Sequence, residues 1–177
     1  MSKAKVATVW LDGCSGCHMS FLDMDERLAG LASKIDLVYS PLVDTKDFPE
    51  MADVTLVEGA VSSTDDLEKI RKVRAHTRIL VSLGDCAVTS NVPAMRNRFP
   101  VQAVMDRAYR ENAQLNPQTP AEVVPALLGK SIPVHEVVAV DVFIPGCPPS
   151  ADTIHFAVSE LLEGRVPDLS SRTRFGI

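Results

Sequence analysis

Four cysteines are the residues whose type and spacing best fit metal or redox chemistry in this 177-residue chain. Cys14 and Cys17 form a C-x-x-C pair, whereas Cys86 and Cys147 stand alone much further along. Thiolates ligate zinc and iron, and a C-x-x-C pair also suits a reactive dithiol. The first residues show no signal-peptide pattern, so we expect a cytoplasmic protein, in which structural disulfides are rare. Metal binding or redox chemistry is therefore the first expectation.

Short apolar runs rich in β-branched residues indicate the elements that must position these cysteines. Nearly continuous apolarity is typical of buried parallel strands, and it predicts strands at residues 6–11, 35–39, 54–57, 79–83 and 137–144. Helical spacings lie between them: one pattern runs from Phe21 to Leu31, one follows a capping sequence at Ser63, and one follows Ser150. The alternation predicts a single α/β domain over residues 1–177, with a flavodoxin-like open parallel sheet of order 2-1-3-4-5 and helices on both faces.

Residues 99–136 interrupt this alternation between the fourth and fifth predicted strands. Prolines recur there around two short helical patterns, at 101–110 and 121–128. A long irregular excursion is often functional, and we expect this one to pack against a partner subunit.

Each cysteine follows the end of a predicted strand. The carboxyl ends of parallel strands line one edge of a sheet, so four thiols far apart in sequence can meet there. Glycines beside the cysteines permit tight turns and a close approach to a bulky inorganic group. The arrangement favours one shared site over four separate ones.

Three chemistries could use such a site. A 4Fe-4S cluster needs four thiolates around a large object, which one C-x-x-C pair and two remote loops can supply. Structural zinc sites are usually built from two paired knuckles, and only one is present here. A thioredoxin-like dithiol, suggested by Trp10 near the C-x-x-C pair, leaves Cys86 and Cys147 without a role.

The charge balance bears on the partners. A formal net charge of -5 and a pI near 5.3 disfavour nucleic acid and anionic membranes, which need a concentrated positive face. The apolar segment near the amino terminus is far too short to span a bilayer.

The sequence resembles the small subunits of nickel-iron hydrogenases, most closely those of the cytoplasmic NAD(P)-coupled, bidirectional group. Four blocks carry the resemblance, in the family's order: Asp12-Gly13-Cys14-Ser15-Gly16-Cys17, Leu56-Val57-Glu58-Gly59-Ala60-Val61, Gly84-Asp85-Cys86-Ala87 and Ile144-Pro145-Gly146-Cys147-Pro148-Pro149. The resemblance implies that Cys14, Cys17, Cys86 and Cys147 bind one 4Fe-4S cluster next to a nickel-iron centre on a large subunit. Electrons from H2 would pass through this cluster toward diaphorase subunits, which carry FMN and iron-sulfur clusters and reduce NAD(P)+.

Two related groups differ in recognisable ways. Exported hydrogenase small subunits have a twin-arginine signal and a carboxyl-terminal domain with further cysteines, and this sequence shows neither. The cluster-bearing subunit of a complex I-like quinone oxidoreductase shares the Gly-Cys-Pro block, but it characteristically has two adjacent cysteines at the first site. Ser15 and Gly16 separate them here, which favours the hydrogenase interpretation.

Other polar residues lie near the expected cluster. Glu58, at the end of the third predicted strand, is a candidate proton relay or interface residue, and hydrogen bonding to a ligand loop is an equal alternative. Asp12 and Asp85 flank ligand turns, where turn capping is the simpler role. His18 is a candidate to contact the cluster or a partner, although we expect a helix-surface histidine. FMN is disfavoured, because cysteines occupy the loop where flavodoxins bind phosphate.

Overall fold

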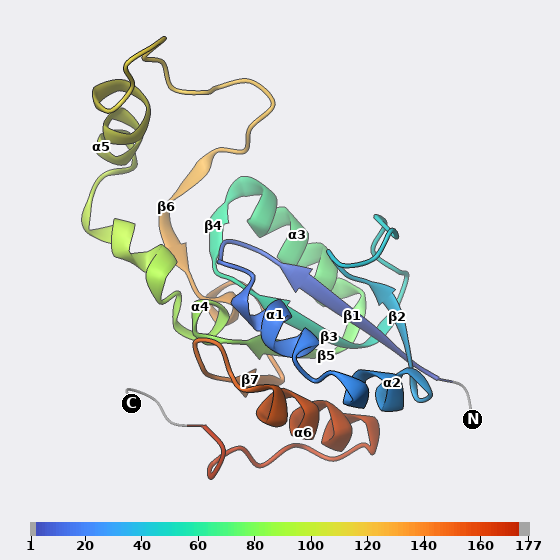
Figure 1. Ribbon diagram of the computed structural model, residues 1–177. Coiled ribbons are helices and arrows are strands. Elements are labelled where there is room, and N and C mark those ends of the chain that lie inside the picture. Colours follow the sequence, from blue (N-terminus) through green and yellow to red (C-terminus); the bar gives the residue numbers. More distant parts are fainter. Residues whose placement is uncertain (1–2, 174–177) are drawn as a thin grey trace.

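The computed structural model describes residues 3–173, and a five-stranded parallel sheet forms its centre (Figure 1). The strands of this sheet are β1 (Ala4–Trp10), β2 (Ile35–Tyr39), β3 (Ala52–Glu58), β5 (Thr77–Leu83) and β7 (Val142–Ile144). Their order is β2-β1-β3-β5-β7, and all neighbours pair in parallel. Counted over the five predicted strands, this is the order 2-1-3-4-5, so the flavodoxin-like prediction is confirmed.

The fifth strand is shorter than predicted. The pattern at residues 137–144 predicts an extended segment throughout, but the strand contains only Val142–Ile144 and follows a 3-10 turn, η3 (Val134–Glu136). Asp141 explains the late start, because its carboxylate accepts a hydrogen bond of 2.7 Å from the backbone N–H of Leu80. A side chain thus replaces a strand carbonyl in the ladder at this position.

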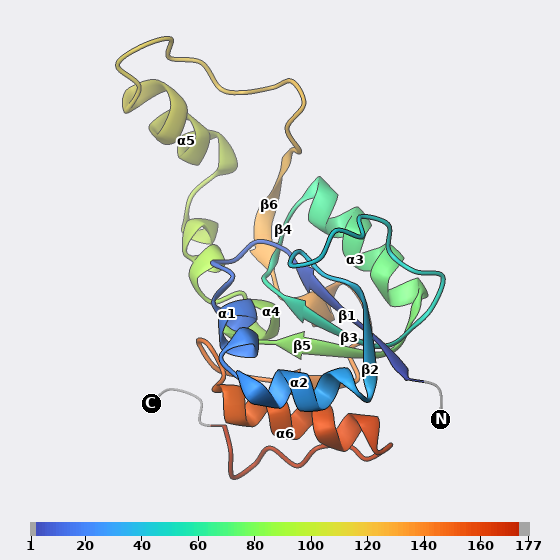
Figure 2. The same cartoon turned by 45° about the vertical axis from the view of Figure 1, so that its right-hand side comes forward.

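Three helices cover one face of the sheet. They are α1 (Gly16–Leu22), α2 (Glu26–Ala32) and α6 (Ala151–Leu162), and Figure 2 shows α2 and α6 side by side. An ion pair of 2.5 Å between Arg27 and Asp152 joins these two helices. Phe21, Met24 and Ile154 belong to the apolar core beneath them. The periodicity from Phe21 to Leu31 predicts one helix, but Asp25, with φ 51°, divides it into two.

The opposite face carries α3 (Thr64–Ala75) and α4 (Asp85–Thr89). As predicted, α3 begins at Ser63, where a capping box joins the Ser63 side chain to the backbone N–H of Asp66 and the Asp66 side chain to the backbone of Ser63. Ile70 and Val73 of α3 and Ala87 of α4 enter the second apolar core.

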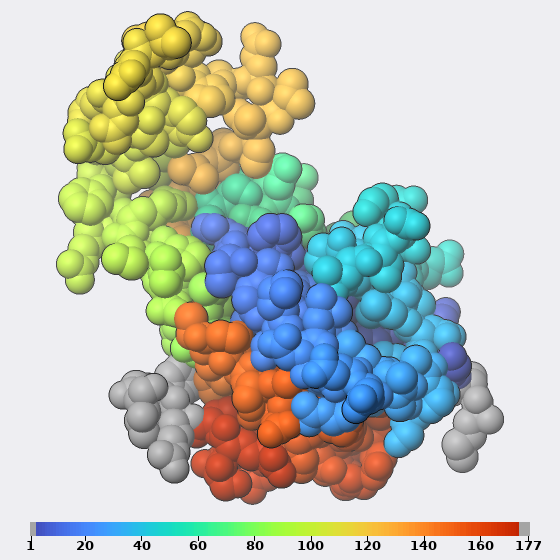
Figure 3. Space-filling view, in the orientation of Figure 1, coloured from blue at the N-terminus to red at the C-terminus, as the bar shows by residue number. Residues whose placement is uncertain are grey.

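Residues 99–126, which we call the arm, project from this body (Figures 1 and 3). The 3-10 helix η1 (Val92–Arg98) leads into α5 (Val101–Asp106) and a π-helical turn, η2 (Arg107–Glu111), where the sequence predicts a helix. The chain returns through β6 (Leu127–Ile132), which pairs antiparallel with β4 (Val61–Ser63). The predicted helix at 121–128 is therefore wrong. A proline interrupts that stretch, and β4 offers its end a strand partner.

None of the helices within residues 3–173 has the length and apolarity needed to cross a membrane.

Candidate metal centre

All four cysteines lie just beyond the carboxyl ends of neighbouring parallel strands. Cys14 follows β1 and Cys17 is the second residue of α1, whereas Cys86 lies in the first turn of α4, after β5. Cys147 follows β7. Because β1, β5 and β7 are parallel, the loops that follow them emerge at the same edge of the sheet.

A cavity of about 260 Å³ opens at this edge. The residues that line it are Asp12, Gly13, Cys14, Cys86, Val92, Pro93 and Cys147. Its volume is several times the roughly 30 Å³ that a water molecule occupies in the liquid, so a polyatomic inorganic group has room there. Cys17 lies behind the wall, with only 7% of its surface exposed.

Gly84 lets the β5 loop approach Cys17 closely. A Cβ atom at this position would lie 2.2 Å from the Cys17 sulfur, and the Gly84 φ of 81° is in the left-handed region. Both facts exclude a larger residue without rearrangement of the loop. The glycine between Leu83 and Asp85 is thus part of the site's architecture.

Hydrogen bonds join the ligand loops to one another. Asp85 donates its backbone N–H to the Gly146 carbonyl at 2.8 Å, and its carboxylate accepts the Gly146 N–H at 2.7 Å. Ser20 of α1 donates to the carbonyl of Pro149 in the Cys147 loop. Asp85 therefore caps a neighbouring turn, as expected. Asp12 lines the cavity and pairs through its backbone with Ala60.

Glu58 and His18 form a buried pair directly behind the C-x-x-C loop. One Glu58 carboxylate oxygen accepts the backbone N–H of His18 at 2.9 Å and lies 2.5 Å from its Nδ1. The other ring nitrogen, Nε2, lies 3.0 Å from the Thr8 hydroxyl, which donates to Ser40 at 2.7 Å. His18 is 2% exposed, so the helix-surface prediction is wrong. Helix α1 turns this residue inward, because the Glu58 carboxylate lies at the end of β3 and accepts its hydrogen bonds.

The thiols lie close enough to influence one another's ionisation. Burial raises the pKa of Cys17 far above its usual value, and the charges of Glu58 and of the other three cysteines act in the same direction. Burial and then the neighbouring Cys147 and Cys14 raise the pKa of Cys86 to about 11. Several thiolates together at this edge therefore need a cation to compensate their charge.

The donor set fits an iron-sulfur cluster. Cys14, Cys17, Cys86 and Cys147 are four thiols from three loops around one cavity, and such a group supplies a one-electron redox centre when bound. Within residues 3–173, no three His, Cys, Asp or Glu side chains are grouped closely enough to bind a single metal ion.

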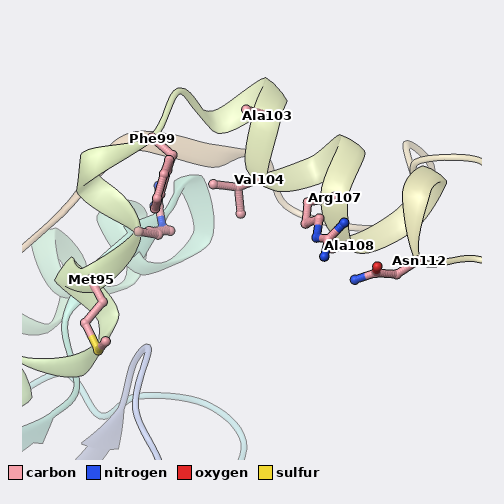
Figure 4. A pocket seen from close by; sticks show the side chains of 8 residues that line it. Met95, Phe99, Ala103, Val104, Arg107, Ala108 and Asn112 are labelled. Atoms are coloured by element: carbon pink, nitrogen blue, oxygen red, sulfur yellow. The ribbon is translucent and has the colours of Figure 1, made fainter.

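The largest cavity of the described residues lies elsewhere, along η1 and the arm. It measures about 710 Å³, and the side chains of Figure 4 that line it are Met95, Arg96, Phe99, Ala103, Val104, Arg107, Ala108 and Asn112. Most of them are apolar and none is a nucleophile or a metal ligand. This groove, unlike the smaller cavity, suits contact with another protein surface.

Sequence reasoning missed one neighbour of the cysteines. Asn91 donates its side-chain Nδ2 to the Cys147 sulfur at 3.5 Å. The two residues are far apart in sequence, and no motif points to their contact.

Comparison with known proteins adds the family. The model for "NADH ubiquinone oxidoreductase, 20 Kd subunit" matches residues 14–161 and thus includes all four cysteines. The chain belongs to this family.

Individual members of the 20 kDa subunit family that resemble the chain are hydrogenase subunits. The delta subunit of the NAD-reducing hydrogenase HoxS of Cupriavidus necator is 45% identical over 96% of this chain and 83% of its own length. One subunit of the F420-non-reducing hydrogenase of Methanothermobacter marburgensis is 38% identical over 96% of this chain, and the match spans 56% of that longer subunit. The resemblance to hydrogenase small subunits is therefore confirmed.

A solved structure agrees over almost the whole chain. It is a crystal structure of an NAD+-reducing [NiFe]-hydrogenase in the H2-reduced state, with a TM-score of 0.94 and 38% identity. The match covers 98% of this chain and 99% of the other.

Proposed function

We propose that this chain is the electron-transfer small subunit of a cytoplasmic, NAD(P)-reducing nickel-iron hydrogenase. Cys14, Cys17, Cys86 and Cys147 would hold one 4Fe-4S cluster. The observation that carries the proposal is the meeting of all four cysteines at one sheet edge, in a chain that matches an NAD-reducing hydrogenase subunit along nearly its full length. A relative of the same family, from Archaeoglobus profundus, is described as an iron-sulfur subunit.

The cluster would accept one electron at a time and pass it on. The chain's own residues hold the ligand loops: Asp85 joins the Cys86 and Cys147 loops, and Gly84 makes room for Cys17. Glu58 anchors the residue after Cys17 through two hydrogen bonds to His18, which supports a bracing role in preference to proton relay. A rigid set of ligands limits reorganisation when the charge of the cluster changes.

The partners we propose are a large subunit that carries the nickel-iron centre and diaphorase subunits with FMN and iron-sulfur clusters. The surface beside the cavity supports a protein partner there. Val92 lines the cavity and is 59% exposed, and Met95 and Phe99 continue the apolar surface toward the arm. Exposed apolar patches of this kind mark contact sites. FMN on this subunit itself is not part of the proposal.

Two alternatives make different predictions. A subunit of a complex I-like quinone oxidoreductase, which the family's description suggests, would bind a cluster but would purify without nickel. A zinc-stabilised interaction module would be colourless and contain zinc.

Anaerobic purification of the complete complex from its native cells tests the proposal. We expect stoichiometric iron and sulfide on this chain, nickel on a co-purifying subunit, and H2-dependent reduction of NAD+ or NADP+. Cys86→Ser should abolish the cluster signal, whereas Thr89→Ser on the same short helix should keep it. Zinc without iron, or a cluster without nickel or hydrogenase activity, would contradict the proposal.

A further inference from the structure

Asn91 lies in a turn with an uncommon backbone, directly after the helix that carries Cys86. Ser90 ends α4 with φ 63°, and Asn91 follows with φ 27° and ψ -118°. Two consecutive positive φ values at non-glycine residues are costly, and they persist where the surrounding structure determines them. Ser90 is 1% exposed, and its backbone N–H donates to the Cys86 carbonyl at 3.1 Å.

This turn directs two donors at two different cysteines. The Asn91 side-chain Nδ2 donates to the Cys147 sulfur at 3.5 Å. The next residue, Val92, offers its backbone N–H to the Cys86 thiol, where it opposes the rise in pKa caused by burial. Residues 91 and 92 therefore connect the α4 loop to both sulfurs that are remote from the C-x-x-C pair.

We propose that Asn91 is a positioning residue that raises the reduction potential of the bound cluster through its hydrogen bond to Cys147. This inference rests on the proposed function. A donor at a ligand sulfur favours the more negative, reduced state of the cluster, because its partial positive charge faces the added electron. The transferred electron comes from the partner's redox centre, and no bond is made or broken at Asn91.

The effect on the potential has a predictable size and sign. Loss of the donor should lower the equilibrium constant for one-electron reduction about three- to tenfold, where tenfold corresponds to about 59 mV. Asn91→Gly removes the donor and accepts the positive φ without strain. Asn91→Asp keeps the shape but turns an acceptor and a negative charge toward the sulfur, so its shift should be larger.

Redox titration of the anaerobic complex, followed by EPR, tests the inference. Asn116→Asp is the matched control, because Asn116 also has a positive φ, 52°, and lies in the arm away from the cysteines. We expect lower midpoints for Asn91→Gly and Asn91→Asp, and an unchanged midpoint for Asn116→Asp. Midpoints that stay unchanged in both Asn91 variants, or that fall equally in the control, would overturn it.

A second measurement does not depend on the variants assembling a cluster. Wild-type complex with 15N in its asparagine side-chain amides should show a 15N coupling to the reduced cluster in pulsed EPR, since Asn91 is the asparagine that contacts a cysteine. A wild-type cluster without this coupling would disprove the contact. Iron content of the wild type separates the two ideas: wild type without iron refutes the proposed function, whereas an iron-loaded protein with unchanged midpoints refutes the role of Asn91 alone.

Discussion

His18 Nδ1 lies 2.5 Å from a carboxylate oxygen of Glu58, and each side chain is only 2% exposed. The same carboxylate oxygen also accepts the backbone N–H of His18. Since His18 directly follows Cys17, this pair ties the start of α1 to the end of β3. The buried pair thus fixes one ligand of the candidate cluster without contacting the cavity itself.

Removing the Glu58 carboxylate should destabilise the chain. Glu58→Ala leaves buried donors of His18 unpaired, and we expect the free energy of unfolding to fall by about 3 kcal/mol. Glu58→Gln, which keeps an acceptor oxygen, should cost less. Urea denaturation of the metal-free chain measures both. Glu68→Ala, at a solvent-facing position of α3, should change stability by less than about 0.5 kcal/mol. Equal stability of Glu58→Ala and wild type would contradict the importance of the pair.

Gly84→Ala should reduce cluster content. The new Cβ would meet the Cys17 sulfur, and the positive φ adds backbone strain of about 1 kcal/mol or more. Iron and sulfide analysis after anaerobic purification measures the loss. Gly30→Ala provides the control, because a Cβ at Gly30 has no neighbour within 4 Å. That variant should keep its iron and gain about 0.5 kcal/mol of stability from better helix propensity. Full iron content in Gly84→Ala would show that the loop adapts.

Asp85→Ala should weaken retention of the cluster, because it removes the 2.7 Å hydrogen bond between the Cys86 and Cys147 loops. Asp85→Asn retains an oxygen that can accept the Gly146 N–H, so it should restore most of the retention. Release of iron to a chelator under anaerobic conditions measures the difference. If alanine and asparagine variants release iron at the same rate as wild type, the bond between the loops is unimportant.

The stability of the metal-free chain should fall at alkaline pH. Burial, with help from Cys147 and Cys14, raises the pKa of Cys86 from 9.0 to about 11 in the folded chain. Between these values the unfolded chain has lost the proton and the folded chain retains it. The stabilisation is therefore present below pH 9.0 and is lost as pH rises toward about 11.

Cys86→Ser provides the check on this pH dependence. It should reduce the alkaline loss by about 1 kcal/mol, less than for a fully buried thiol because Cys86 is partly exposed. Denaturation curves at several pH values measure it, with cysteines kept reduced. Parallel pH profiles for wild type and Cys86→Ser would refute the assignment.

Local sequence signals were sufficient for the sheet and for the positions of the cysteines. Continuous β-branched runs, such as the one in β1, predict buried parallel strands because both faces of such a strand are covered. Ser63 and Ser150 marked helix starts correctly, since a side-chain oxygen that caps a first turn is a local interaction. Local signals failed where distant segments compete. The stretch at 121–128 has a helical pattern, yet residues 127–132 form a strand because β4 supplies a partner.

The sequence by itself determined that four cysteines follow strand ends at one edge of a parallel sheet, because strand pattern and chain order suffice for that conclusion. Only the tertiary structure decided that His18 points inward to Glu58, that Gly84 faces the Cys17 sulfur, and that Asn91 reaches Cys147. Each of these contacts joins residues from different loops. Their distances depend on how helices and loops pack against the sheet, and no local pattern of residues encodes that packing.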